Sequence, residues 1–265
     1  MSLAALACLL AQPALLWIAL RQTDRPGGGL VMALIVAAVA ATATAVLALF
    51  TESIGNLSVA LWFGLGASLL TLSLAGLWRR EAWRLAAPMA VYGEVLALAA
   101  VLVELTAGKE GEGARYGDLA WLGAHVVVSV ATYGVLTVAA VAGLAVFLQE
   151  RSLKRRTAPT RMIRVLPAAA DAEEIQSRLL LVSAWLLGAG VLTGVAVEYL
   201  RQGRLLIFDH KTVLTLVALA VVVVLLLLDR RLGLGGRRIA RVVLFAYLLI
   251  TLAYPGVKFV TQILM

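Results

Sequence analysis

Two side chains have the clearest chemical potential, because the 265-residue chain contains only two histidines, His125 and His210. A neutral imidazole nitrogen coordinates metal ions and haem iron near physiological pH. His125 lies near the start of the apolar segment Trp121–Leu148, and His210 directly precedes the apolar segment Lys211–Leu228. Two imidazoles at one depth in a membrane could hold a planar metal cofactor from both faces.

Composition sets the class of protein that must position these histidines. The chain is 62% hydrophobic, whereas soluble domains are roughly 45–50% apolar. Apolar runs of about 20 residues, the length that crosses a ~30 Å hydrocarbon core, recur throughout. We therefore predict an all-α, polytopic integral membrane protein with one transmembrane domain over residues 1–265. The expected spans, about eight, are Leu3–Leu20, Leu30–Phe50, Ser58–Leu77, Leu85–Thr106, Leu119–Leu148, Leu179–Leu200, His210–Leu228 and Ile239–Ile263.

The loops between these spans predict the orientation. Most of the 23 basic residues lie in alternate connections, namely those after the first, third, fifth and seventh spans. Basic loops stay in the cytoplasm, so both termini are expected on the outer, periplasmic side of a bacterial inner membrane. The same distribution explains the net charge of +8 without a nucleic-acid partner. The longest connection, residues 149–178, is predicted to be a partly ordered cytoplasmic loop.

A row of functional side chains accompanies the first histidine. Trp121, His125, Ser129 and Tyr133 are spaced four residues apart, which places them along one slowly winding face of a helix. Such polar groups should face the interior of a helix bundle, where they find partners. The alternative is a structural histidine bonded to a neighbouring carbonyl, with Trp121 at the membrane interface.

The second histidine lies in a short polar sequence. Asp209 precedes it and could cap the helix or orient the imidazole, and Lys211 follows it. Arg201 and Arg204 occupy the preceding connection, at the same predicted outer face. Lys211 could pair with Asp209, extend to the interface or meet a carboxylate of an anionic ligand. The alternative is an ordinary polar start of a helix at the membrane surface.

Two further features of the sequence can be explained by contacts between helices as well as by function. Glu94 lies well inside the fourth span, where it would either bond a neighbouring helix or form a proton or cation path. Gly188, Gly190 and Gly194 form a stripe of small residues in the sixth span, which is typical of close helix packing.

Together these residues resemble the cytochrome c assembly family of membrane proteins (CcsA/CcmC type), in particular its YpjD/HemX-like branch. The resemblance covers residues 119–265, which we take as the family-like core, while the first four spans agree in size and layout only. The matching motifs are Trp121-x3-His125-x3-Ser129-x3-Tyr133-Gly134, Leu148-Gln149-Glu150-x2-Leu153-Lys154, Leu192-Thr193-Gly194, Asp209-His210-Lys211-Thr212, Gly236-Arg237-Arg238 and Ala253-Tyr254-x-Gly256-Val257-Lys258-Phe259.

The resemblance implies haem handling at the outer membrane face. His125 matches a family histidine proposed as an axial haem ligand, and Asp209 and Lys211 match an Asp-Pro-Lys-Glu stretch in which His210 replaces the proline. Larger members carry a tryptophan-rich loop before that aspartate, whereas residues 201–208 contain no tryptophan. The resemblance thus implies haem as the cofactor. We expect that the protein has no haem ligase activity and is not an enzyme.

Three functional hypotheses follow. The first is a haem-binding protein for haem handling, export or cytochrome c biogenesis, with His125 and His210 as iron ligands and Trp121 and Tyr133 lining the pocket. The second is a regulatory or scaffold subunit of tetrapyrrole synthesis that docks a partner through the 149–178 loop. The third is a small-ion transporter that uses Glu94. The expected partners are haem, the lipid bilayer and other membrane or cytochrome-maturation proteins.

Overall fold

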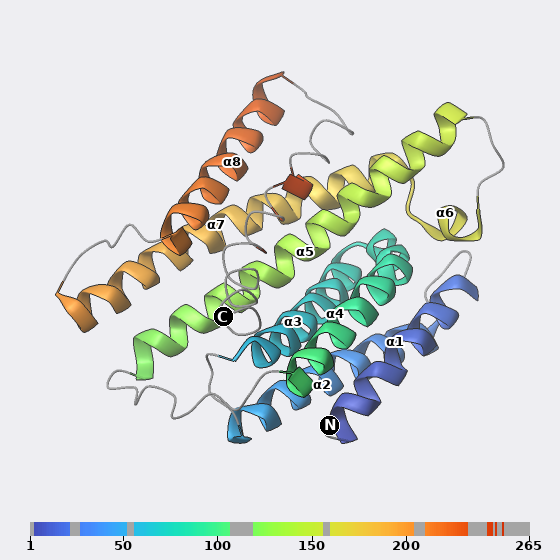
Figure 1. Cartoon of the computed structure of the whole chain (residues 1–265). Coiled ribbons are helices and arrows are strands. Elements are labelled where there is room, and N and C mark those ends of the chain that lie inside the picture. Colours follow the sequence, from blue (N-terminus) through green and yellow to red (C-terminus); the bar gives the residue numbers. More distant parts are fainter. Residues whose placement is uncertain are drawn as a thin grey trace.

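The computed structural model describes residues 3–21, 27–51, 56–106, 119–155, 160–203, 210–232, 243–245, 247 and 251. Every regular element within these residues is helical. The elements are α1 (Leu3–Arg21), α2 (Gly28–Thr51), α3 (Leu57–Trp78), the 3-10 helix η1 (Arg80–Leu85), α4 (Ala86–Thr106), α5 (Leu119–Arg155), α6 (Arg161–Val165), α7 (Ala169–Gln202) and α8 (His210–Leu232), shown in Figure 1.

The length and apolar character of these helices fit a membrane-spanning protein. Five segments are long and apolar enough to cross a bilayer, and α1 and α8 contain shorter apolar stretches. Large apolar side chains also cover the outside; on α4, for example, Val91, Val95, Leu98 and Leu102 are all exposed. Water would penalise such a surface, whereas hydrocarbon does not. The all-α, multi-pass prediction is confirmed at this level.

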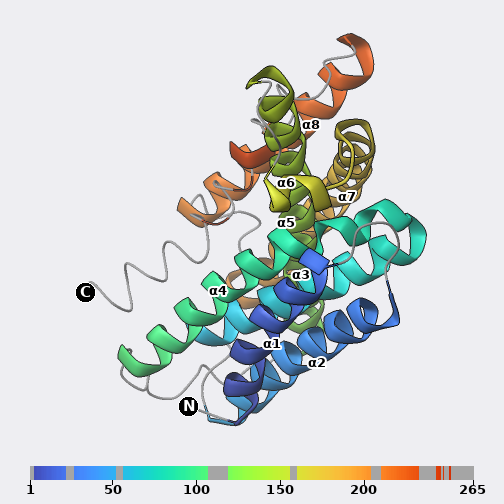
Figure 2. The same cartoon turned by 90° about the vertical axis from the view of Figure 1, so that its right-hand side faces the viewer.

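The first four helices form one group around α3. Within the stretch of α3 that is apolar enough to span a membrane, 72% of the residues are buried. Its core side chains Trp62, Leu65, Leu69 and Leu72 have no exposed surface. α2 packs on α1 and α3, and α4 packs on the same two helices from another side. Figures 1 and 2 show this group to one side of the long helix α5.

The second group is built on the pair α5 and α7, the most extensive helix pairing in the structure. α5 joins this pair to the first group through α3. A Cβ atom on Gly134 of α5 would lie 2.7 Å from the backbone oxygen of Ala67 on α3, so the two backbones meet where the chain has glycine. α8 packs against α7 (Figure 1).

Much of the segment expected to be a partly ordered loop is helical in the described residues. α5 continues to Arg155 and α7 begins at Ala169, so both helices extend well into the 149–178 segment. The Gln149 amide nitrogen donates to the carbonyl oxygens of Ile163 and Pro167, each at 3.1 Å. These bonds hold the short helix α6 against the end of α5.

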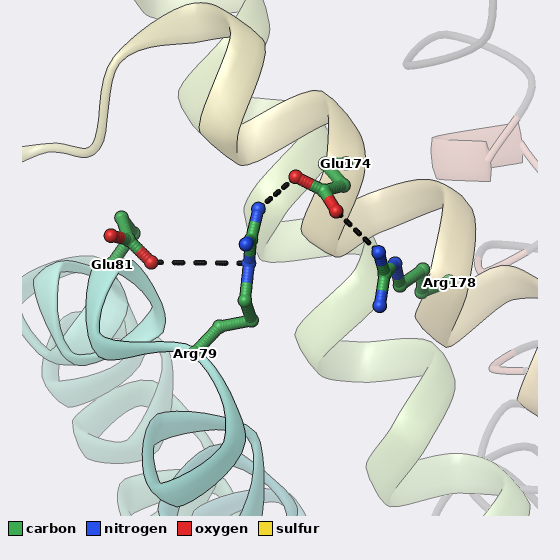
Figure 3. A network of polar contacts seen from close by, with 4 residues as sticks. All are labelled: Arg79, Glu81, Glu174 and Arg178. Carbon is green, nitrogen blue, oxygen red and sulfur yellow. Dashed lines mark hydrogen bonds and ion pairs between the residues drawn. The ribbon is translucent and has the colours of Figure 1, made fainter.

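Charged side chains contact one another in the part of α7 that precedes its expected start at Leu179, about three helical turns. Glu174 accepts a hydrogen bond from Arg79, the residue after α3, and pairs with Arg178 one turn along its own helix at 2.6 Å (Figure 3). Arg79 also lies 3.9 Å from Glu81, and Arg178 covers the Trp78 ring at 4.5 Å from its centroid. Ion pairs four residues apart support a helix in a charged stretch, for which hydropathy gives no signal.

The predicted spans agree with the described helices in order and approximate position. The first seven correspond to α1, α2, α3, η1 with α4, α5, α7 and α8. Most of the eighth, Ile239–Ile263, lies outside the described residues, although Val243–Phe245, Tyr247 and Thr251 are helical. The number of membrane crossings therefore stays a prediction, as does the position of the termini.

Candidate functional site

His125 lies in the second turn of α5 and faces α7. The two helices run in opposite directions, so the start of α5 meets the end of α7. The imidazole is half-buried, and its Nδ1 atom lies 3.2 Å from the Thr193 Oγ1 atom on α7. The ring is thus held between helices at one end of the pair.

The hydrogen bonds of Thr193 decide which ring nitrogen carries the proton. Its hydroxyl lies 2.9 Å from the carbonyl oxygen of Ala189 and 3.1 Å from that of Gly190, both on its own helix. A threonine hydroxyl has one proton, which these carbonyls take. Oγ1 then accepts from Nδ1 of His125, and the imidazole is also hydrogen-bonded to the backbone of Gly190. In the tautomer with the proton on Nδ1, Nε2 is the nitrogen that can act as a metal ligand.

Gly194 provides the space that the imidazole occupies. A Cβ atom at this position would lie 3.2 Å from Cε1 of His125, closer than ordinary van der Waals contact. By contrast, a Cβ atom on Gly188 would have no neighbour within 4 Å, and one on Gly190 would lie 3.8 Å from Val128. Within the stripe of small residues, Gly194 therefore makes room for His125, whereas Gly188 and Gly190 are not at close contacts between helices.

The row that begins at Trp121 does not face one environment. Trp121 is 50% exposed and Ser129 is exposed, so the expectation of an interior position is wrong for these two. Successive members advance by ~40° around the helix, because four residues exceed one turn of 3.6. The row consequently winds from the surface of α5 at Trp121 through the α7 contact at His125.

Tyr133, two turns beyond His125, belongs to a different cluster. Its hydroxyl lies 3.1 Å from those of Tyr92 on α4 and Tyr247 near the C-terminus, and Tyr247 donates to Tyr92 at 2.8 Å. The three hydroxyls form a closed triangle in which each can donate once and accept once. This cluster joins α4, α5 and the C-terminal segment.

The remaining predicted site residues lie wholly or partly outside the described residues. His210 and Lys211 are the first residues of α8, and Arg201 lies in the last turn of α7. Only the backbones of these three residues are described. Arg204 and Asp209 lie in the 204–209 gap. The predicted pairing of His125 with His210 thus stays a prediction. Among the side chains that are described, no three His, Cys, Asp or Glu residues gather as a metal site.

Thr193 and Gly194 are the site residues that reasoning on single residues missed. Both belong to a motif that supported the family resemblance, but neither was assigned a partner. Both lie against His125, which is 68 positions before Thr193 in the chain, and no local pattern encodes such a distance.

The fold and the site define this molecule as a helical membrane protein with an imidazole held at one end of a helix pair. Its sequence matches the family described as Cytochrome C assembly protein over residues 2–265. The chain belongs to this family, and the match includes the first four helices.

Comparison with individual proteins adds one informative relative. An Azospirillum brasilense protein described as an uncharacterized 28.8 kDa protein in the nifR3-like 5' region is 45% identical over 210 residues. The alignment covers 79% of this chain and 76% of that protein. No solved structure matches the chain significantly.

Proposed function

We propose that this protein binds haem at the end of the α5–α7 pair, with His125 as an axial ligand through Nε2. The observation that carries the proposal is the contact of Nδ1 with Thr193 Oγ1 at 3.2 Å, which supports the tautomer whose Nε2 lone pair can bind iron. A hydrogen bond on the far nitrogen is the usual arrangement of a metal-bound histidine, since it fixes the ring and raises its basicity. Family membership points to the same cofactor.

The neighbouring residues have distinct proposed roles. His210 is the second candidate ligand of the haem iron, oriented by Asp209. Arg201, Arg204 and Lys211 bind the propionates, because they are cationic and lie in or beside the connection that follows α7. Trp121, one turn before His125 and half exposed, offers an aromatic surface beside the porphyrin. Bound haem supplies an iron centre that accepts axial nitrogen ligands.

The proposed cellular role is haem handling or export, or a step of cytochrome c biogenesis, in a bacterial inner membrane. Alternating basic connections support an outer position for the site. Other membrane or cytochrome-maturation proteins would receive the haem. We propose that the chain itself performs no enzymatic step.

An optical spectrum tests the assignment. Full-length protein purified in detergent from haem-replete cells should show a Soret band, and His125→Gly should weaken or abolish it. Added imidazole should restore the band in His125→Gly, because the small ligand fills the space of the lost ring. His210→Ala should shift the spectrum toward a form with one histidine ligand. Spectra that stay unchanged in both variants would refute haem ligation by these residues.

A regulatory or scaffold role is the second candidate, supported by the order of the connection between α5 and α7. Arg151 and Lys154 are exposed at the end of α5, and Arg164 is exposed on α6, which Gln149 holds against α5. A partner with an acidic surface would fit it. Co-purification of a protein that depends on these three cations, from cells in which the chain carries no haem, would favour this role.

A further inference from the structure

A polar cluster lies between α1 and α4, within the first helix group and apart from the histidine site. Cys8 and Gln12 on α1 have no exposed surface. The Gln12 amide nitrogen donates to the Cys8 sulfur at 4.0 Å. Glu94 lies on α4, which packs against α1, and is within electrostatic range of the Cys8 thiol.

The amide oxygen of Gln12 is held directly against the backbone of α4. A Cβ atom on Gly93 would lie 2.5 Å from this Oε1 atom, so a larger residue here would force the Gln12 side chain to move. Despite its complete burial, Oε1 accepts no hydrogen bond. A buried acceptor without a donor is unfavourable, and the few cases in folded proteins call for a specific explanation.

Glu94 supplies a second buried oxygen that lacks a hydrogen-bond donor. Its Oε2 atom is buried and has no hydrogen-bond partner. The ion pairs of the described residues join Arg79, Glu81, Glu174 and Arg178, so none of them neutralises Glu94. An ionised carboxylate brings no proton to the cluster, and its charge is costly within a membrane.

We propose that Glu94 is a proton-binding site, whose acid O–H donates to the amide oxygen of Gln12. One proton then satisfies both oxygens: Glu94 donates to Gln12, and Gln12 donates to Cys8. Glu94 directly follows Gly93, over which the Gln12 oxygen lies, and consecutive Cα atoms are about 3.8 Å apart. The Glu94 carboxyl group therefore starts from the same turn of α4 that the Gln12 oxygen contacts, and it interacts electrostatically with Cys8, the other partner of Gln12.

The surroundings of Glu94 make this acid accessible from the lipid. The Glu94 side chain is partly exposed, and its neighbours Val91, Val95 and Leu98 are exposed apolar residues on the same helix. Hydrophobic carbodiimides reach such a position through the bilayer and add to a carboxylic acid in its protonated form. The result is an N-acylurea on the glutamate.

The experiment uses the full-length protein in lipid vesicles treated with dicyclohexylcarbodiimide at neutral pH. Peptide mass spectrometry should find the adduct on Glu94. Infrared spectra should show the carbonyl band of a protonated acid, which Glu94→Gln removes. Gln12→Leu should move this band to higher frequency, because the acid loses its acceptor. Glu104→Gln is the matched control on the same helix; its carboxylate accepts from Trp62 Nε1 at 2.9 Å, so the acid band should remain.

Three outcomes would overturn the proposal. Loss of carboxylate bands rather than the acid band in Glu94→Gln would show an ionised Glu94, whether free or paired with a cation. Unmodified Glu94 in treated wild-type vesicles would exclude the protonated form without relying on any variant. An unshifted band in Gln12→Leu would remove Gln12 as the partner. The haem spectrum is a separate measurement, so neither proposal depends on the other.

Discussion

Thr193 Oγ1 lies 3.2 Å from Nδ1 of His125, while the Thr193 hydroxyl proton is used by carbonyl groups on its own helix. The imidazole must therefore donate from Nδ1. A residue on α7 thus sets the tautomer of a residue on α5, and any change in the α5–α7 pairing alters the direction of Nε2.

Removal of the Thr193 hydroxyl should weaken haem binding while leaving the protein folded. Thr193→Val keeps the side-chain shape but leaves the Nδ1 proton without its acceptor. Loss of such a contact typically lowers metal affinity by about 10–100-fold. Haem titration of the purified variant measures the change. Thr193→Ser keeps a hydroxyl and should bind as the wild type does, and equal affinity for the serine and valine variants would contradict this role.

A methyl group at Gly194 should displace the imidazole. The added Cβ atom would lie 3.2 Å from Cε1 of His125, so the ring must move by a few tenths of an ångström. We expect Gly194→Ala to lower haem content and to shift the Soret band or the electron paramagnetic resonance signal of the iron. Gly188→Ala is the control, since a methyl group there has no neighbour within 4 Å. Equal effects of both substitutions would point to general helix destabilisation instead.

The orientation of the chain can be tested with reporter fusions. Basic residues gather in the connections after the first, third, fifth and seventh predicted spans, and these connections are expected to stay in the cytoplasm. A reporter fused after Arg156 should be active only in the cytoplasm, and one fused after Met265 only outside. The opposite pattern would move His125 to the inner face.

The sequence could predict the helices but not the contacts between them. Apolar runs located α1 to α5, α7 and α8, since hydrocarbon requires long helices with satisfied backbones. Hydropathy placed the start of α7 at Leu179, whereas the helix begins at Ala169. The additional turns include Glu174, which contacts Arg79, 95 residues away in sequence.

For the candidate site, too, the sequence could indicate a residue but not the contacts between helices. Residue chemistry was sufficient to select His125, because it is one of two histidines in an apolar chain. The tautomer, the space at Gly194 and the tyrosine triangle depend on side chains from different helices. Tyr133 and Tyr247, for example, are separated by 114 residues. Spacing along one helix grouped Tyr133 with His125, whereas its hydroxyl bonds to tyrosines of other segments.

The final prediction concerns haem ligation to apocytochrome c. A ligase must hold haem at an open surface while two cysteine thiols reach its vinyl groups, which requires a broad aromatic shelf outside the bilayer. Here α7 ends at Gln202 and α8 begins at His210, so the intervening connection is short. It contains no tryptophan and carries Arg204. We therefore expect that this protein alone does not restore cytochrome c maturation in a strain that lacks its assembly system. Haem staining of denaturing gels measures the outcome, with a complete assembly system as the positive control. Covalently stained cytochrome c in the complemented strain would show that ligation does not need the tryptophan-rich loop.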